Sequence, residues 1–202
     1  MLFVKKSFLR YTINIRYFFM PKATVKHGPW ETKYEGIIFT VKQRDVFFPD
    51  GSTKRFEYSF RPHSVVIMPF DKKGRLLLIN EFRHGVNRYT YFLPAGRIDG
   101  AEKPLVAAKR ELREETGMGA KKWKFLRKRF ANSNTVWESH IYLAKDLYPS
   151  AARGDEDFPI TVKAFSMRQA VKMALDGSIA NEFIAYNILY LDYLMKTKKF
   201  KW

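Results

Sequence analysis

Three glutamates lie close together in the middle of the chain, at Glu111, Glu114 and Glu115. Side chains three or four residues apart share one face of an α-helix, so these carboxylates are expected to gather within about one helical turn. Neighbouring carboxylates repel one another unless a cation lies among their oxygens. Mg²⁺ is the usual cation where phosphate groups supply the remaining ligands. The spacing therefore predicts a helix that binds a divalent cation for chemistry on a phosphate.

The residues around the glutamates suit a helix that packs on a core. A glycine-containing loop leads into it, Pro104 is placed for its first turn and Gly117 for its end. The apolar positions beside the acids form a stripe at helical spacing, made of Leu105, Ala108 and Leu112. We therefore expect the stripe to be buried while the carboxylates face a cleft.

A simpler interpretation is a solvent-exposed helix held by ion pairs, because Arg110 and Arg113 lie among the glutamates. The complete spacing favours the metal site. Residues 96–118 resemble the Nudix hydrolase signature: Gly, five residues, Glu, seven residues, Arg-Glu, an aliphatic residue, any residue, Glu-Glu, any residue, Gly and an aliphatic residue. Every specified place is filled, by Gly96, Glu102, Arg110, Glu111, Leu112, Glu114, Glu115, Gly117 and Met118. The resemblance implies a loop–helix–loop that holds Mg²⁺ or Mn²⁺ against a diphosphate.

The resemblance also implies roles for individual residues of this segment. The expected metal ligands are the carboxylates of Glu111 and Glu115, supported by Glu114, and the carbonyl of Ala95. We interpret Glu102 and Arg110 as groups that orient the ligands. Salt bridges that merely hold the loop on the helix are the alternative role for these two residues.

The flanks of the signature resemble the ADP-ribose pyrophosphatase and nucleoside-diphosphate-sugar hydrolase branch of the family. The similarity runs from about residue 30 to 191 and rests on residues 81–83 (Glu-Phe-Arg), 93–96 (Leu-Pro-Ala-Gly) and 176–179 (Asp-Gly-Ser-Ile). That branch releases a nucleoside monophosphate and a sugar phosphate. Phe92 stands where the branch often has an acid, and residues 131–138 lack the usual proline. These departures favour a broader or different preference, such as GDP- or ADP-linked sugars.

The general base for water attack must be one of the clustered acids, such as Glu115, or an acid elsewhere. In this branch it often comes from a mobile acidic loop, which residues 154–157 (Gly-Asp-Glu-Asp) match by position. We choose Glu156 as the base, with Glu138 as the alternative. A solvated turn is the other interpretation of this acidic run.

Several residues outside the signature are candidates for substrate binding. The guanidinium fork of Arg83 suits a phosphate or the terminal sugar, although an exposed strand charge is an equal alternative. Three aromatic residues are candidates to stack on the base, and core packing is the alternative for each of them: Trp30, Phe82 and Tyr91.

The composition of the whole chain limits the other classes of function. Its 202 residues suit one domain with a small appended subdomain, and 46% apolar residues are enough for a core. There is no cysteine, which excludes disulfides and thiolate metal sites, and we expect a cytoplasmic location. No apolar run approaches the roughly 20 residues that cross a bilayer, so no membrane partner is expected.

The net charge of the chain is +17, from 37 Lys and Arg against 20 Asp and Glu. Such a charge suits a nucleic-acid partner. We favour a generally basic surface that attracts anionic nucleotides, because the basic residues are scattered and no RNA-binding motif is present. Two alternative functions stay open: an RNA-end pyrophosphohydrolase, and a non-catalytic nucleotide-binding module with the same fold.

Strand and helix patterns predict a mixed α/β fold. Strands are expected at 36–42, 44–48 and 54–60, the last two around a Pro-Asp-Gly turn, and again at several places after residue 63. Besides the glutamate segment, helices are expected at about 167–175, capped by Ser166, and at 182–195. The resemblance implies a Nudix-type α/β/α sandwich with a mixed sheet, plus a small N-terminal antiparallel β subdomain.

We divide the chain into four parts. Residues 1–19 form a basic extension that we expect to be flexible, 20–62 the N-terminal β subdomain, 63–196 the catalytic domain, and 197–202 a basic tail. In the family members that the chain resembles, a similar N-terminal sheet builds a homodimer. The exposed aromatic edges of a small sheet favour a contact with a second subunit that covers them. We therefore expect a homodimer formed through this sheet.

Overall fold

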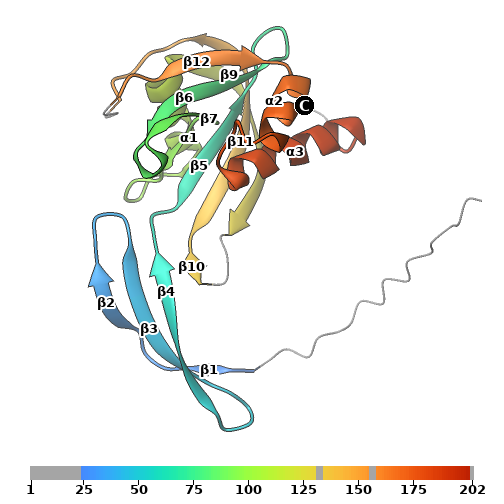
Figure 1. Ribbon diagram of the computed structural model, residues 1–202. Coiled ribbons are helices and arrows are strands. Elements are labelled where there is room, and N and C mark those ends of the chain that lie inside the picture. The colour runs from blue at the N-terminus through green and yellow to red at the C-terminus, as the bar shows by residue number, and fades with distance from the viewer. Residues whose placement is uncertain (1–23, 131–133, 155–157, 201–202) are drawn as a thin grey trace, which may run out of the picture.

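The computed structural model describes residues 24–130, 134–154 and 158–200 (Figure 1). Two regions of the chain are visible, a curved N-terminal sheet and a larger α/β unit that contains all three helices of the described residues (Figure 1). The predicted extension at 1–19, the acidic residue Glu156 and the last residues of the predicted tail lie outside these ranges.

The N-terminal sheet is built around one long hairpin. Its strands are β1 (Lys26–His27), β2 (Glu31–Glu35), β3 (Thr40–Phe47), β4 (Thr53–Phe60) and β10 (Thr135–Val136). The turn between β3 and β4 is the predicted one: Gly51 has a φ of +84°, and Ser52 donates two hydrogen bonds to the Asp50 carboxylate. The strand expected at 36–42 is wrong in part, because residues 36–39 form the turn between β2 and β3.

β10 joins this sheet from a distant part of the sequence. It runs parallel to β4, with Thr135 opposite Ser59 and Val136 opposite Phe60. The hydroxyls of Ser59 and Thr135 are 3.0 Å apart, and the Ser59 amide donates to the Asn134 carbonyl. The segment before β11 is thereby fixed to the end of β4.

Two sheets make up the α/β unit. The four-stranded sheet has the order β8 (Ala95–Arg97), β5 (Ser64–Pro69), β11 (Glu138–Pro149) and β9 (Met118–Phe130). It is mixed, since β5 and β11 are parallel while the other pairs are antiparallel. The three-stranded antiparallel sheet has the order β12 (Thr161–Phe165), β6 (Leu76–Arg83) and β7 (Arg88–Phe92), with the 3₁₀-helix η1 (His84–Val86) between the last two.

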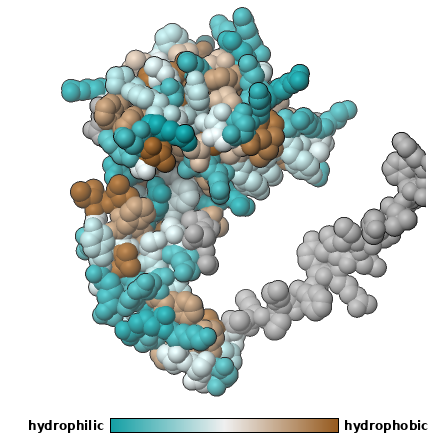
Figure 2. Space-filling model, viewed as in Figure 1, coloured by the Kyte–Doolittle hydropathy of each residue, from teal (hydrophilic) through white to brown (hydrophobic). Residues whose placement is uncertain are grey.

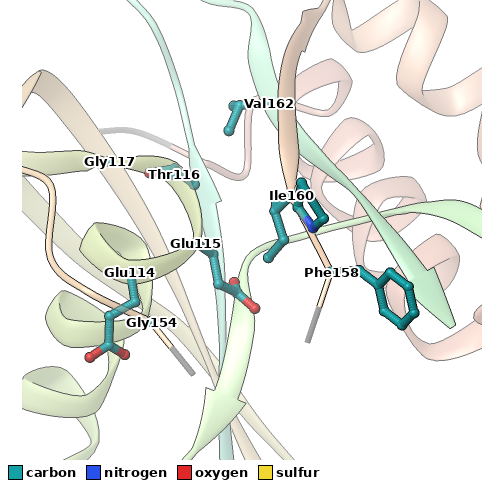
Figure 3. A pocket seen from close by; sticks show the side chains of 9 residues that line it. Glu114, Glu115, Thr116, Gly117, Gly154, Phe158, Ile160 and Val162 are labelled. Atoms are coloured by element: carbon teal, nitrogen blue, oxygen red, sulfur yellow. The ribbon is translucent and has the colours of Figure 1, made fainter. Parts of the chain in front are cut away.

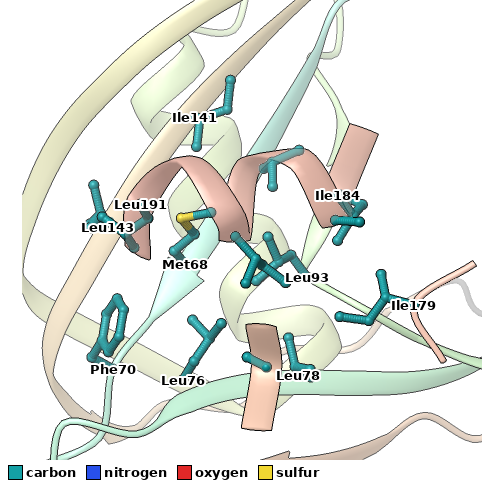
Figure 4. Packing of buried hydrophobic residues seen from close by; sticks show 14 residues of the cluster. Met68, Phe70, Leu76, Leu78, Leu93, Ile141, Leu143, Ile179, Ile184 and Leu191 are labelled. Carbon is teal, nitrogen blue, oxygen red and sulfur yellow. The ribbon is translucent and has the colours of Figure 1, made fainter. Parts of the chain in front are cut away.

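Helices cover both faces of the four-stranded sheet. The helices are α1 (Pro104–Thr116), α2 (Met167–Leu175) and α3 (Glu182–Lys196). Val65 and Ile67 of β5 pack with Leu112 of α1 in one buried cluster. Met68, on the other face of β5, packs with α2, α3 and the three-stranded sheet in the second cluster (Figure 4). This arrangement confirms the α/β/α sandwich with a mixed sheet that the resemblance implies.

The helix boundaries follow the sequence signals closely. α2 begins after Ser166, whose hydroxyl accepts from the Gln169 amide while the Gln169 side chain accepts from the Ser166 amide. This reciprocal pair is a capping box. α3 extends one residue beyond its predicted end. In the described ranges, no helix is long and apolar enough to cross a membrane.

Candidate active site

Helix α1 presents its glutamates at the edge of the core. Gly117 ends the helix with a φ of +69°, and its amide donates to the Arg113 carbonyl. The apolar stripe packs on the four-stranded sheet, where Leu112 is fully buried. Glu111 and Glu115, one turn apart, are only 8% and 6% exposed. The burial of the stripe therefore brings two carboxylates into surroundings with little water.

The backbone of β8 lies directly against these two carboxylates. The Ala95 amide donates a 2.8 Å hydrogen bond to Glu115 Oε2. A Cβ atom added to Gly96 would lie 2.0 Å from both the carboxyl carbon and Oε1 of Glu111, far inside contact distance. Only glycine leaves room for the Glu111 carboxylate at this point. Ala95 contacts Glu115 through its backbone amide.

Arg110 links the glutamates to the preceding loop. Its Nη1 donates to Glu111 Oε1 at 2.7 Å and to Glu114 Oε2 at 3.0 Å. Its Nη2 donates to Glu102 Oε2 at 3.1 Å and to the Arg97 carbonyl at 2.9 Å. The hydrogen bond from Arg110 holds the pKa of Glu102 below its ordinary value. One guanidinium thus contacts three carboxylates and the carbonyl of the last residue of β8.

The donor set suits a hard divalent cation. Burial raises the pKa of Glu111 to about 7, against the opposing effect of Arg110. A cation beside a buried carboxylate removes this penalty, since it favours the charged form. Within the described ranges, no group of three or more His, Asp or Glu side chains is gathered into a metal-binding cluster. Among the described residues, the positive charge between Glu111 and Glu114 is supplied by Arg110, whose Nη1 donates to both carboxylates.

A cavity of about 560 Å³ opens beside the end of α1. It is lined by Glu114, Glu115, Thr116 and Gly117, and across from them by Gly154, Phe158, Pro159, Ile160 and Val162. Figure 3 shows the Glu115 carboxylate on the side of Ile160 and Phe158, whereas Glu114 points the other way. Gly154 and Phe158 are the described residues on either side of the acidic run that contains Glu156.

Glu138, the alternative base, lies at the start of β11. Its carboxylate forms an ion pair with Lys128 at 3.1 Å and lies 3.7 Å from His140 Nε2. Its backbone amide donates to His63 Nδ1 at 3.0 Å. The structure thus places this carboxylate beside a lysine of β9, and Glu138 does not line the cavity beside Glu115.

Arg83 lies between two further cavities, of about 470 and 350 Å³. Its Nη2 is 2.7 Å from Glu81 Oε2, and its guanidinium stacks 4.0 Å from the Phe92 ring centroid. The smaller cavity borders Ala95 and Gly96, which also contact the buried glutamates. The substrate contact predicted at Arg83 therefore has an open volume next to the metal-ligand candidates.

The smaller cavity is also lined by two residues, Arg61 and Trp137, that were not among the predicted binding residues. Arg61 follows β4, and Trp137 lies between β10 and β11. The Arg61 guanidinium stacks 4.9 Å from the Trp137 ring, and it has no carboxylate partner in the described part of the chain. Burial lowers the pKa of Arg61. A half-buried cation without a protein counter-ion suits an anionic ligand.

The three aromatic candidates lie in different surroundings. Phe82 lines the 470 Å³ cavity and contacts Phe158 with ring centroids 4.7 Å apart. Tyr91 packs on the core and against Phe165. Trp30 lies on the N-terminal sheet, where the Arg44 guanidinium stacks 4.0 Å from its ring. Of the three, only Phe82 is brought together with Arg83.

Comparisons with known proteins agree with this geometry. A family model for the NUDIX domain matches residues 60–185, which include the whole of α1. The ADP-ribose pyrophosphatase of Bacillus subtilis (strain 168) is 27% identical over 164 residues, covering 80% of this chain and 89% of that protein. The ADP compounds hydrolase NudE of Escherichia coli (strain K12) is 37% identical over 134 residues, covering 64% and 71%. A crystal structure of an ADP compounds hydrolase matches with a TM-score of 0.77 at 28% identity, covering 86% of this chain and 95% of that chain.

Proposed function

Because this chain belongs to the Nudix family and is a pyrophosphohydrolase, we propose that it hydrolyses the diphosphate of nucleoside diphosphate sugars, including ADP-linked compounds. The products are a nucleoside monophosphate and a sugar phosphate. The observation that carries the proposal is the burial of Glu111 and Glu115 against β8, beside a cavity with Arg61 and Arg83 in its lining. The names of the relatives, an ADP-ribose pyrophosphatase and an ADP compounds hydrolase, support the same class of substrate.

Mg²⁺, or Mn²⁺ in its place, is the cation that we propose. Glu111 and Glu115 would hold it, supported by Glu114 and by a carbonyl of the β8 backbone at Ala95. When bound, such a cation neutralises phosphate charge and lowers the pKa of a bound water. Arg110 keeps the carboxylates of Glu111 and Glu114 in place through its two Nη1 hydrogen bonds.

The cavity of about 350 Å³ is our proposed substrate pocket. Arg83 and Arg61 would bind phosphate or sugar oxygens, since a guanidinium fork matches such oxygens. The stack of Arg61 on Trp137 keeps this guanidinium in one orientation. Phe82, in the neighbouring cavity, supplies an aromatic surface for the nucleoside.

Glu156 remains our proposed general base. Its support is that Gly154 and Phe158, on either side of the acidic run, line the cavity beside Glu115. The position of Glu138 disfavours the alternative, because its carboxylate is paired with Lys128 and does not line the cavity beside Glu115.

A homodimer through the N-terminal sheet (residues 20–62) is part of the proposal. Its support is apolar surface at the end of β2 and in the turn to β3, where Tyr34 is 60% exposed, Ile37 96% and Ile38 48% (Figure 2). Exposed apolar surface of this kind marks interaction sites. Residues 63–196 form the proposed catalytic domain. A cytoplasmic location is also proposed, in keeping with the absence of cysteine.

A substrate panel with and without Mg²⁺ tests the proposed function. The panel contains ADP-ribose, ADP-glucose, GDP-mannose, triphosphorylated RNA and capped RNA. We expect Mg²⁺-dependent release of nucleoside monophosphate from the sugars, and its loss in EDTA and in Glu115→Gln. Cleavage of the RNA substrates alone, with activity falling steeply with salt, would instead support an RNA-end pyrophosphohydrolase. Binding without turnover of any compound would support the non-catalytic module.

A further inference from the structure

A separate cavity of about 210 Å³, called the rear cavity below, lies on the side of α1 that faces away from Glu111 and Glu115. Lys109 and Arg113 line it from the helix. With 3.6 residues per turn, these two positions are roughly opposite Glu111 and Glu115. The remaining lining comes from the start of β9 and the end of β11: Gly119, Ala120, Trp123, Tyr148 and Ser150. The cavity shares no lining residue with the three cavities around the active site.

The charge of this rear cavity is unbalanced. Lys109 and Arg113 are four residues apart on the helix, a spacing at which like charges repel. Neither has an ion pair with a carboxylate in the described ranges, and the hydrogen bond from Arg113 Nε goes to the Ser150 carbonyl at 3.3 Å. The closeness of the helix C-terminus offsets part of the repulsion. An anion between the two side chains would offset the rest.

The walls of the rear cavity are aromatic and fixed in position. The Trp123 ring is held by a 3.0 Å hydrogen bond from its Nε1 to the Ala120 carbonyl. The Tyr148 ring lies against the backbone of Gly119, where an added Cβ would come within 2.6 Å of the ring. Glycine at this position therefore allows the ring to form a wall. Rigid aromatic faces suit the apolar face of a sugar ring.

We propose that the rear cavity between α1, β9 and β11 is a second binding site that takes a small sugar phosphate, with its phosphate between Lys109 and Arg113 and its sugar against Trp123 and Tyr148. The volume of about 210 Å³ is below the roughly 300–1,000 Å³ of sites for drug-sized ligands, so a whole nucleotide sugar is too large. The site goes beyond the proposed function and does not depend on hydrolysis.

Isothermal titration of the full chain in EDTA tests the site, with ribose 5-phosphate, inorganic phosphate and ribose as probes. Ribose 5-phosphate is expected to bind more tightly than inorganic phosphate, and ribose not at all. Arg113→Gln and Lys109→Gln are each expected to weaken ribose 5-phosphate binding at least tenfold. Tyr148→Ser is expected to weaken ribose 5-phosphate binding without changing that of inorganic phosphate.

Two control variants separate this site from other sources of binding. Lys121→Gln removes an exposed cation of β9 that does not line the cavity, and is expected to leave binding unchanged. Arg83→Gln, which alters the proposed substrate pocket, is expected to leave unchanged the binding that Arg113→Gln weakens. Loss of binding in Arg83→Gln would place the ligand in the active site and overturn the proposal, as would equal affinity of the wild type and Arg113→Gln. Failure of hydrolysis alone would overturn the proposed function and leave this result standing.

Discussion

The Glu111 carboxylate occupies the space that a side chain on residue 96 would fill. A Cβ on Gly96 would be 2.0 Å from the Glu111 carboxyl carbon. The residue at one position therefore limits the other, although the two are 15 positions apart in the sequence. Residue 96 therefore has to be glycine for the Glu111 carboxylate to keep its position.

Gly96→Ala is therefore expected to displace the Glu111 carboxylate and to lower kcat/KM by about 100-fold, because an active-site shift of this kind costs about that factor. Steady-state kinetics on the best nucleotide sugar would measure it. Gly28→Ala is the control, because a Cβ there meets its nearest neighbour at 3.5 Å, an ordinary contact distance. Equal losses in the two variants would contradict the explanation.

Arg110→Gln is expected to raise the Mg²⁺ concentration for half-maximal activity by about 10- to 100-fold, the usual cost of removing a group that orients metal ligands. The physical reason is that Arg110 holds Glu111, Glu114 and Glu102 together. Arg113→Gln is a matched control on the same helix, and its Mg²⁺ dependence should equal that of the wild type. An unchanged Mg²⁺ curve in Arg110→Gln would show that the ligands need no such support.

A comparison of kcat in Glu156→Gln and Glu138→Gln is expected to identify the general base. Loss of a general base costs about 10²- to 10⁴-fold in kcat, and we expect this loss in Glu156→Gln only. We expect a smaller loss of kcat in Glu138→Gln, because the Glu138 carboxylate is paired with Lys128. Circular dichroism of both variants checks that the fold is kept. The reverse order of the two losses would move the assignment to Glu138.

Ile37→Asp is expected to convert a dimer into monomers, because a charge at the centre of an apolar contact is costly to desolvate. Sedimentation velocity of wild type and variant would measure the change. Leu175→Asp is the control, since Leu175 is 71% exposed on α2, far from the N-terminal sheet in sequence. A monomeric wild type at micromolar concentration would contradict the proposed dimer.

The features predicted from the sequence are those whose cause is local. The cap at Ser166, the stop at Gly117 and the apolar stripe of α1 depend on residues within a few positions, so their patterns are readable in the chain. The position of Arg110 beside Glu114, four residues on, follows from helix spacing in the same way.

The features that were missed depend on contacts between distant segments. Arg61 and Trp137 meet because β10 pairs in parallel with β4, and no periodicity in either segment predicts that pairing. That Arg61 has no carboxylate partner among the residues the structure describes becomes visible only once its neighbours are placed. The part-wrong strand at 36–42 has a local reason: Ile37 and Ile38 favour a strand, but the Gly36 amide donates a hydrogen bond to the Phe39 carbonyl and turns the chain there.

The pairing of β10 with β4 has a mechanical consequence. Arg61 directly follows β4 and Trp137 directly follows β10, so both leave the N-terminal sheet together and enter the wall of the 350 Å³ cavity. A rotation of that sheet would carry this wall with it, while β8 and the glutamates stay with the α/β unit. We expect the width of the proposed substrate pocket to depend on how the sheet is held, which would link the proposed dimer contact to the fit of the substrate.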